Sequence, residues 1–132
     1  MNSVIDLNLP ENKVSAKIID CGLYIHKKLG PGLLESAYEE SLFHLLTQKE
    51  KLKVERQKVL PIQLGDLRID AGYRLDLLVD DKIIVEIKSV ERLLPIHEAQ
   101  IMTYLKLSGL KIGLLMNFNT PLFKDGLRRI VL

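Results

Sequence analysis

The sequence predicts an α/β fold in which a mixed β-sheet is flanked by helices, within one domain that spans residues 1–132. Three observations lead to this fold class. Apolar residues recur with a helical period up to about Lys49, and they alternate as in strands from about Lys53 to Val90. A third helical stretch is then followed by a nearly uniform apolar run from Lys111 to Phe118, as expected for a strand covered on both faces.

Composition narrows the class of protein. The chain has 132 residues, enough for one domain with its own core, and its 47% hydrophobic and 27% charged content is that of a soluble globular protein. A net charge of +2 is too small to predict nucleic-acid binding from bulk charge, so any basic surface must be local. No segment has the length of a membrane span, and the first residues carry Asp6 and Glu11 without a long apolar run. We therefore expect a cytoplasmic protein.

Two helices open the chain. The first is predicted from Asn12 to Leu29, and Gly30-Pro31-Gly32 ends it. Its apolar residues follow the i, i+4, i+7, i+11 rhythm and are Val14, Ile18, Cys21, Ile25 and Leu29. The second runs from Leu34 to Lys49, with an apolar face of Leu34, Tyr38, Leu42, Leu45 and Leu46. Because the connection is short, the two helices should be neighbours. Cys21 has no partner for an internal disulfide, so we expect a reduced thiol in the core.

A meander of three strands follows. The first strand ends near Leu64 at a Gly65-Asp66 turn, and Pro61 places it at a sheet edge or at a bulge. The second runs from Leu67 to Val79, and the third from Lys82 to Val90 after a turn at Asp80-Asp81.

The last part of the chain adds a helix and two strands. Pro95 begins a helix that continues to Ser108 and is closed by Gly109. Its apolar stripe is predicted to be Ile96, Ala99, Met102 and Leu105. The strand from Lys111 to Phe118 comes next, and Gly126 to Leu132 forms a last short strand.

The third strand of the meander carries the chemistry. Alternation places Ile83, Val85 and Ile87 on one face, and Glu86 and Lys88 on the other. Asp76 precedes them on the neighbouring strand. Two carboxylates can hold Mg2+, and a lysine beside them can stabilise charge on a phosphate or orient a water. Any half-exposed strand can carry Glu and Lys two residues apart, so this pattern needs support from its surroundings.

The hairpin register decides whether Asp76 and Glu86 can share a metal. A two-residue loop at Asp80-Asp81 would set Asp76 opposite Val85 and send the two carboxylates to opposite faces. A three-residue loop that includes Lys82, or one bulge, would set Asp76 opposite Glu86. We predict this second register.

Other polar residues have simpler explanations beside the functional one. The third helix carries a polar row at i, i+3 and i+7, formed by His97, Gln100 and Tyr104. The polar border of an amphipathic helix is the simpler explanation of this row, and for His97 taken by itself we favour it. Glu35 lies in the first turn of the second helix, a position that the helix dipole already favours. We expect His26 and His44 at surface or boundary positions. Solvated faces explain the pair Arg128-Arg129 and the run Lys49–Lys58 as well as phosphate contacts do.

Taken together, these elements resemble the PD-(D/E)XK nuclease superfamily, with its restriction-endonuclease-like core. Asp76, then Glu86-Ile87-Lys88 on the next strand, then Gln100 and Tyr104 on a helix resemble its RecB-like branch. The run Gly32-Leu33-Leu34-Glu35-Ser36-Ala37-Tyr38 matches the GxxExxY motif of a small family within it. Two further segments resemble that family, His97-Glu98-Ala99-Gln100 and Gly113-Leu114-Leu115-Met116-Asn117-Phe118-Asn119.

The resemblance implies a role for each site residue. Asp76 and Glu86 would be direct ligands of Mg2+ or Mn2+, the Ile87 carbonyl a third, and Glu35 would act near the metal, directly or through solvent. Lys88 would position the attacking water and offset charge on the scissile phosphate. Gln100 and Tyr104 would orient the site or contact the nucleic-acid backbone, and His97 would be accessory. The chain departs from the superfamily's name in having Leu75 before Asp76 instead of proline.

The sequence thus supports two functions. The first is a Mg2+-dependent nuclease that hydrolyses phosphodiester bonds, with DNA as the favoured nucleic acid. The second is a non-catalytic regulatory domain that keeps the nuclease fold and binds nucleic acid or protein. Because a domain of this size has little surface for sequence readout, specificity would come from a homodimer or a protein partner.

Overall fold

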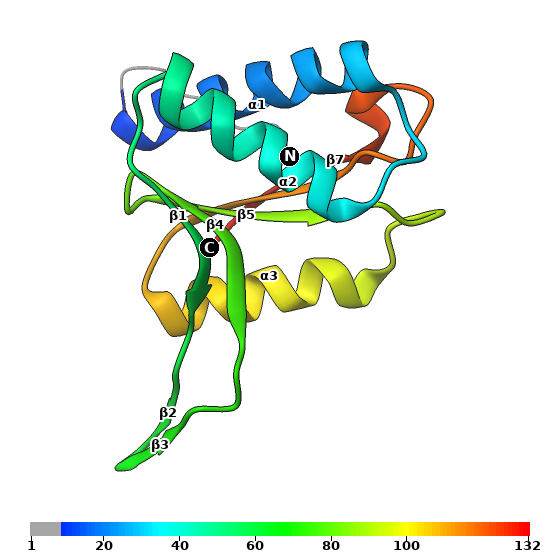
Figure 1. The fold of residues 1–132 in the computed structure, drawn as a ribbon. Coiled ribbons are helices and arrows are strands. Elements are labelled where there is room, and N and C mark those ends of the chain that lie inside the picture. Colours follow the sequence, from blue (N-terminus) through cyan, green and yellow to red (C-terminus); the bar gives the residue numbers. More distant parts are fainter. Residues whose placement is uncertain (1–8) are drawn as a thin grey trace.

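The computed structural model describes residues 9–132, which form a five-stranded mixed sheet with helices on both faces (Figure 1). This is the α/β architecture that the sequence predicts. In spatial order the strands are β1 (Val54–Val59), β4 (Arg74–Val79), β5 (Ile83–Lys88), β6 (Ile112–Asn117) and β7 (Leu127–Val131). The helices are α1 (Pro10–Leu29), α2 (Glu35–His44), which continues into a π-helical turn at Leu45–Lys49, and α3 (Pro95–Ser108). Helices α1 and α2 cover one face and α3 covers the other (Figure 1). Within the described residues, no helix is long and apolar enough to cross a membrane.

The two N-terminal helices follow their predicted patterns except at one end of each. Val14, Ile18, Cys21 and Ile25 are buried in α1, whereas Leu29 is 45% exposed in the last turn. In α2 the buried apolar residues are Tyr38 and Leu42, followed by Leu46 in the π-helical turn. Leu34 was expected on this face but is 78% exposed, because it precedes the helix in extended conformation.

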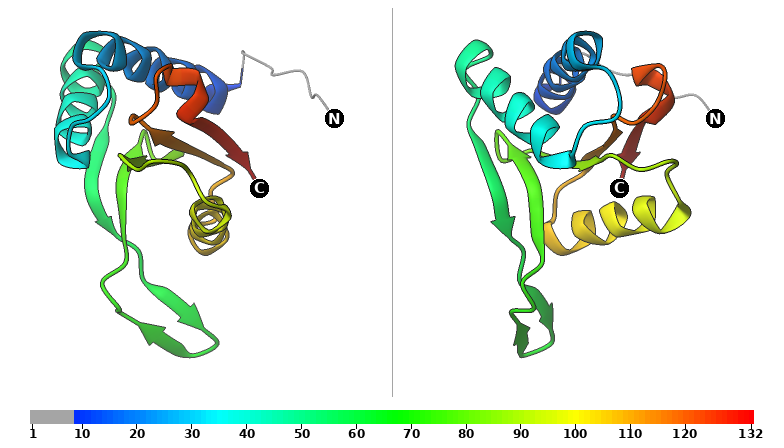
Figure 2. Two further views of the ribbon diagram at one scale, coloured as in Figure 1. Left: turned by 90° about the vertical axis from the view of Figure 1, so that its right-hand side faces the viewer. Right: turned by 45° about the vertical axis from the view of Figure 1, so that its right-hand side comes forward.

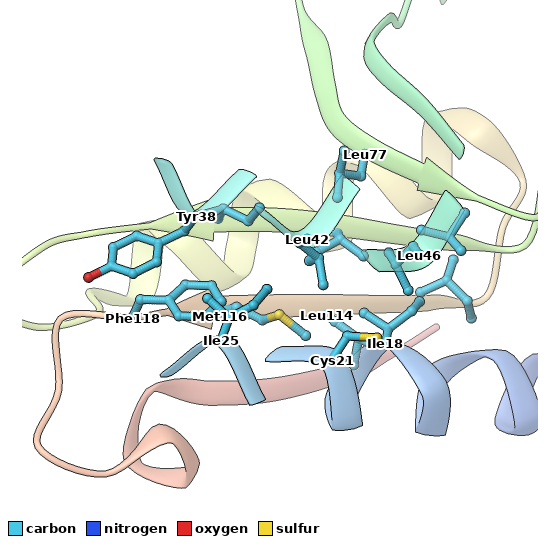
Figure 3. Packing of buried hydrophobic residues seen from close by; sticks show 14 of the residues in the cluster. Ile18, Cys21, Ile25, Tyr38, Leu42, Leu46, Leu77, Leu114, Met116 and Phe118 are labelled. Carbon is cyan, nitrogen blue, oxygen red and sulfur yellow. The ribbon is translucent and has the colours of Figure 1, made fainter. Parts of the chain in front are cut away.

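Tyr38 connects the α1–α2 loop to the core. Its ring is fully buried and stacks on Phe118, with the ring centroids 4.4 Å apart and the planes inclined by 6° (Figure 3). Its hydroxyl donates to the Gly30 carbonyl at 2.6 Å and accepts from the Leu33 backbone N–H at 3.1 Å. These bonds fix the loop directly before Glu35, and therefore fix where α2 begins.

The predicted meander is present, but its first two strands are each interrupted. The chain leaves the sheet at Leu60-Pro61 and returns after Gly72, whose φ is 80°. Between these points β2 (Ile62–Leu64) and β3 (Leu67–Ile69) pair with each other as a separate ribbon that projects from the body (Figures 1 and 2). Proline has no N–H for a sheet ladder, which accounts for the break. As predicted, this first strand lies at an edge of the sheet.

The β4–β5 hairpin has the predicted register. Leu77 pairs with Val85 and Val79 with Ile83, so Asp80 to Lys82 form a three-residue connection. Asp80 and Asp81 adopt left-handed backbone angles, φ 53° and 54°, which aspartate tolerates better than most residues. One further step along this register sets Asp76 opposite Glu86.

The second half of the chain completes the sheet. Helix α3 begins at Pro95, ends before a left-handed Gly109, and joins β5 to the parallel strand β6. All six residues of β6 are buried, as predicted for a strand covered on both faces. A 3-10 turn at Phe123–Gly126 then leads into β7, which pairs antiparallel with β6.

The predicted apolar stripe of α3 was wrong in part. Ile96 is 66% exposed, and the residues that pack against the sheet are Ile101, Tyr104 and Leu105. This helix carries apolar residues on more than one side, so periodicity alone selected a stripe of which only Leu105 is buried. His26, expected at a surface or boundary position, is 8% exposed, with Nε2 2.8 Å from the Thr120 carbonyl. That contact joins positions 94 residues apart, and no local pattern reveals it.

Replacing Tyr38 by phenylalanine should lower the free energy of unfolding by about 1–3 kcal/mol, because the Gly30 carbonyl and the Leu33 N–H lose a partner while the ring stacking remains. Urea denaturation measures the change. Tyr24→Phe is the matched control, since Tyr24 is 47% exposed, and it should alter stability by less than about 0.5 kcal/mol. Equal effects of the two substitutions would contradict this role of the hydroxyl.

Candidate active site

The backbone pairing of β4 with β5 ends before Asp76 and Glu86. At this position the carboxylates of the two residues accept the backbone hydrogen bonds instead. The Asp76 N–H donates to Glu86 Oε2 at 2.8 Å, and the Ile87 N–H donates to Asp76 Oδ2 at 2.8 Å. Each carboxylate therefore accepts a hydrogen bond from the backbone of the opposite strand. This exchange brings the two acidic side chains together, as the predicted register requires.

Burial makes the charge on this pair costly. Glu86 is only 4% exposed, and its pKa rises from the usual 4.5 to about 8, mainly because burial removes water from the carboxylate and then because Asp76 is negatively charged. The hydrogen bond from the Asp76 N–H and the charge of Lys88 act in the opposite direction. Burial also raises the pKa of Asp76, although the hydrogen bond from the Ile87 N–H lowers it. The surroundings of the pair therefore favour a bound proton, above all on Glu86.

Lys88 and Ile87 continue β5 beyond the pair. Lys88 is partly buried and lies two residues after Glu86, and its charge lowers the pKa of both acidic groups. The Ile87 side chain points the other way, into the core shared with α1 and α2, where it is 1% exposed. Only backbone groups of Ile87 therefore face the two carboxylates.

Glu35 lies near the end of β5. It is the first residue of α2, its side chain is exposed, and its Oε2 accepts a hydrogen bond from the Ser89 N–H at 3.3 Å. Ser89 directly follows Lys88, and its hydroxyl donates to the Leu33 carbonyl at 2.6 Å. These contacts hold the start of α2 against the end of β5, which brings Glu35 to the neighbourhood of Lys88.

A second acidic residue of α2, Glu39, was not among the predicted site residues. It is 9% exposed, and its charge raises the pKa of both Asp76 and Glu86. Arg56 donates to Glu39 Oε2 at 3.0 Å, and Gln57 donates to Glu39 Oε1 at 2.8 Å. Because Glu39 lies one helical turn after Glu35, the i, i+4 spacing is the signal that would have drawn attention to it.

Gln57 was also missed, and it connects Glu39 with the acidic pair. Its Nε2 lies 2.8 Å from Glu39 Oε1 and 3.4 Å from Asp76 Oδ1. The β1–β4 register, with Arg56 opposite Leu77 and Lys58 opposite Leu75, places Gln57 beside Asp76. Gln57 has a left-handed backbone with φ 49°, which is rare for a residue within a strand. Nothing in the local sequence distinguishes this position.

The residues predicted on α3 divide into two groups. Gln100 and Tyr104 line a cavity, and the pKa of Tyr104 is raised first by burial and then by the charge of Glu86, with smaller contributions from Tyr73 and Asp76. Tyr104 packs in the same cluster as Leu115, which pairs with Glu86, so it lies on the face of the sheet that carries Glu86. His97 accepts a hydrogen bond from the Leu94 N–H at 3.0 Å through Nδ1, so it caps the start of α3.

The side chains at this site fit a hydrated divalent cation. Within residues 9–132, no group of three or more His, Cys, Asp or Glu side chains is arranged to hold a metal ion, so the predicted ligand set is not gathered as a triad. Mg2+, however, retains several waters and is commonly held by only one or two carboxylates. Asp76 and Glu86 supply two hard oxygen donors, and a bound cation would replace the proton that burial favours on Glu86.

The comparison with protein families agrees with this fold. The family model described as the PD-(D/E)XK nuclease superfamily matches residues 12–130, which is most of the chain. The protein therefore belongs to the PD-(D/E)XK nuclease superfamily, whose nucleases generally use divalent metals. Neither the curated proteins nor the solved structures include a significant match.

Glu86→Gln should make the protein more stable at alkaline pH. Between pH 4.5 and about 8, folded Glu86 keeps a proton that the unfolded chain has released, so the free energy of unfolding falls as the pH rises through this window. The substitution removes this loss, and its stabilising effect should grow from near zero at pH 4.5 to the order of a few kcal/mol above pH 8.

Urea denaturation in the presence of a chelator, at a series of pH values, measures this difference. Glu98→Gln is the matched control, because the Glu98 side chain is 49% exposed on α3. The control should differ from wild type by the same small amount throughout. A Glu86→Gln difference that stays constant with pH would contradict the assignment.

Proposed function

We propose that the protein is a Mg2+- or Mn2+-dependent nuclease that hydrolyses phosphodiester bonds, with DNA as the favoured substrate and the cytoplasm as its location. Within the superfamily we place it in the GxxExxY family of the RecB-like branch, on the run from Gly32 to Tyr38. The observation that carries the proposal is the pair formed by half-buried Asp76 and buried Glu86, joined by exchanged backbone hydrogen bonds, with Lys88 two residues after Glu86 on β5.

In this proposal each residue has a distinct role. Asp76, Glu86 and the Ile87 carbonyl hold the cation, and Glu35 acts from the start of α2 through solvent. The bound cation supplies a Lewis acid for the phosphate and an acidified water. Lys88 is partly exposed beside the pair, where its ammonium group offsets charge on the scissile phosphate and orients the attacking water.

The α3 side of the site positions the substrate. Gln100 and Tyr104 line the cavity next to the acidic pair, so they are suited to orient the strand that is cleaved. The net charge of +2 gives little general attraction for a polyanion, and Arg56 is already paired with Glu39 and Glu40. We therefore propose that a homodimer or a protein partner contributes to substrate binding.

One observation favours a second candidate function. The carboxylates of Asp76 and Glu86 already accept backbone hydrogen bonds, which hold β4 and β5 together where their ladder ends. The pair would keep this structural role in a domain without catalysis. The second candidate is accordingly a regulatory domain that binds nucleic acid or protein and retains the nuclease fold.

Cleavage of labelled single- and double-stranded DNA and RNA in Mg2+ or Mn2+ separates the two candidates. We expect cleavage of at least one substrate, abolished by a chelator. Lys88→Ala should reduce the rate by about 10^2- to 10^3-fold, because a positive charge that stabilises the transition state is lost. Asp76→Asn should reduce it at least as much.

Lys111→Ala is the control for the loss of a lysine. Lys111 is exposed and precedes β6, whose Ile112 pairs with Ile83 at the end of β5 opposite to Lys88. This variant should cleave like the wild type. Binding of a nucleic acid without cleavage in either metal would support the regulatory domain, and cleavage that survives in both Lys88→Ala and Asp76→Asn would exclude this site as its source.

A further inference from the structure

A cavity lies between α3 and the base of the β2–β3 ribbon. Its volume is about 300 Å³, at the lower end of the range for small-ligand sites. Ile62 and Tyr73 line it from the ribbon side, and Gln100, Thr103 and Tyr104 line it from α3. Figure 2 shows the ribbon leaving the sheet on the side of the molecule that α3 covers.

Tyr104 relates this cavity to the proposed active site. It belongs to the cavity wall and packs in the same cluster as Ile84 and Leu115. Glu86 pairs with Leu115 and follows Ile84 by two residues on β5, so it lies on this same face of the sheet. Tyr104 is 6% exposed, so it forms the inner part of the cavity. Tyr73 is 44% exposed and leaves much of its ring open to a ligand. A molecule bound here would therefore reach from the Tyr73 ring toward the acidic pair.

The side chains that line the cavity indicate which kind of ligand it binds. Among the described residues, no charged side chain lines the cavity, which makes it a poor site for a phosphate or an acidic peptide. Tyr73 offers a flat ring for stacking, and Gln100 offers an amide that both donates and accepts hydrogen bonds. A flat aromatic ring with polar atoms on its edge satisfies both groups. A nucleobase has this structure, and every base can stack on an aromatic side chain.

We propose that this cavity binds one unpaired nucleobase of the strand whose phosphate lies at Asp76 and Glu86. Tyr73 stacks on the base, and Gln100 hydrogen-bonds to its edge. A base inside a duplex is stacked and paired, so the substrate class is single-stranded or locally opened nucleic acid. The position of the phosphate rests on the proposed nuclease function, whereas the binding of a base can be measured without cleavage.

The test uses a single-stranded oligonucleotide that carries the fluorescent base 2-aminopurine, with the Lys88→Ala protein to prevent cleavage. Binding should quench the fluorescence, because the base stacks on Tyr73. Adding Tyr73→Ala should remove the quenching and weaken single-strand binding by roughly tenfold to a hundredfold. Affinity for a duplex of the same sequence should change less than about twofold. Tyr73→Phe keeps the ring and should bind like its parent.

Tyr24→Ala in the same background is the matched control, since Tyr24 is 47% exposed on α1 and Tyr73 is 44% exposed. This control should leave both affinities and the quenching unchanged. The proposal is overturned if Tyr73→Ala behaves like the control, or if it weakens single-strand and duplex binding equally. Sedimentation tests whether a second copy of the protein covers the cavity. A dimer that dissociates in Tyr73→Ala would show that it does, and would overturn the base site.

The outcomes also separate this inference from the nuclease function. Quenching that depends on Tyr73, in a protein that cleaves none of the four nucleic acids tested, would support the base site and contradict the nuclease. Metal-dependent cleavage by the wild type, with no quenching and no effect of Tyr73→Ala, would support the nuclease and contradict the base site.

Discussion

The exchange of hydrogen bonds between Asp76 and Glu86 and the backbone of the opposite strand is the interaction on which the site depends. Two antiparallel strands ordinarily satisfy their N–H groups with carbonyls of the ladder. Here Asp76 and Ile87 donate instead to side-chain carboxylates, so the strands part while both polar groups remain bonded. The same bonds hold two acidic groups together, Glu86 buried and Asp76 half-buried, and the pKa of each rises.

The surroundings of the pair maintain this unfavourable arrangement. The left-handed Asp80 and Asp81 set the three-residue connection, and this connection sets the register that opposes the two acids. Gln57, also left-handed, donates to Asp76 and to Glu39. Unusual backbone conformations of this kind persist only where the rest of the structure holds them, and they concentrate at functional sites. Either a proton or a cation can neutralise the carboxylates of Asp76 and Glu86. The stability of the fold is therefore linked to the proposed binding of a cation.

Local patterns were sufficient to predict most of the fold. The helices, the meander, the buried strand β6 and the edge position indicated by Pro61 all follow from periodicity and turn chemistry within a few residues. The hairpin register was predictable only with a functional hypothesis, because the sequence permits two loop lengths at Asp80. The chemical requirement that Asp76 and Glu86 face the same side selected the observed one.

The features that were missed depend on contacts distant in sequence. Gln57 meets Asp76, 19 residues away, because β1 pairs with β4. It meets Glu39, 18 residues away, because α2 packs near these strands. The β2–β3 ribbon depends on where the two long strands leave the sheet, and burial of His26 depends on the loop after β6. Glu35 was identified from its motif, but its contact with Ser89 requires the packing of α2 against the end of β5.

The most direct test of the central claim, that the Asp76–Glu86 pair is a divalent-cation site, is the proton release that accompanies Mn2+ binding. Calorimetric titration at pH 7 in two buffers of different ionisation enthalpy measures it. With a pKa of about 8, Glu86 is largely protonated at this pH, so Mn2+ must displace close to one proton for each ion bound. The account predicts this release, together with its loss in Glu86→Gln. Binding without proton release, or no binding of Mn2+ at all, would contradict it.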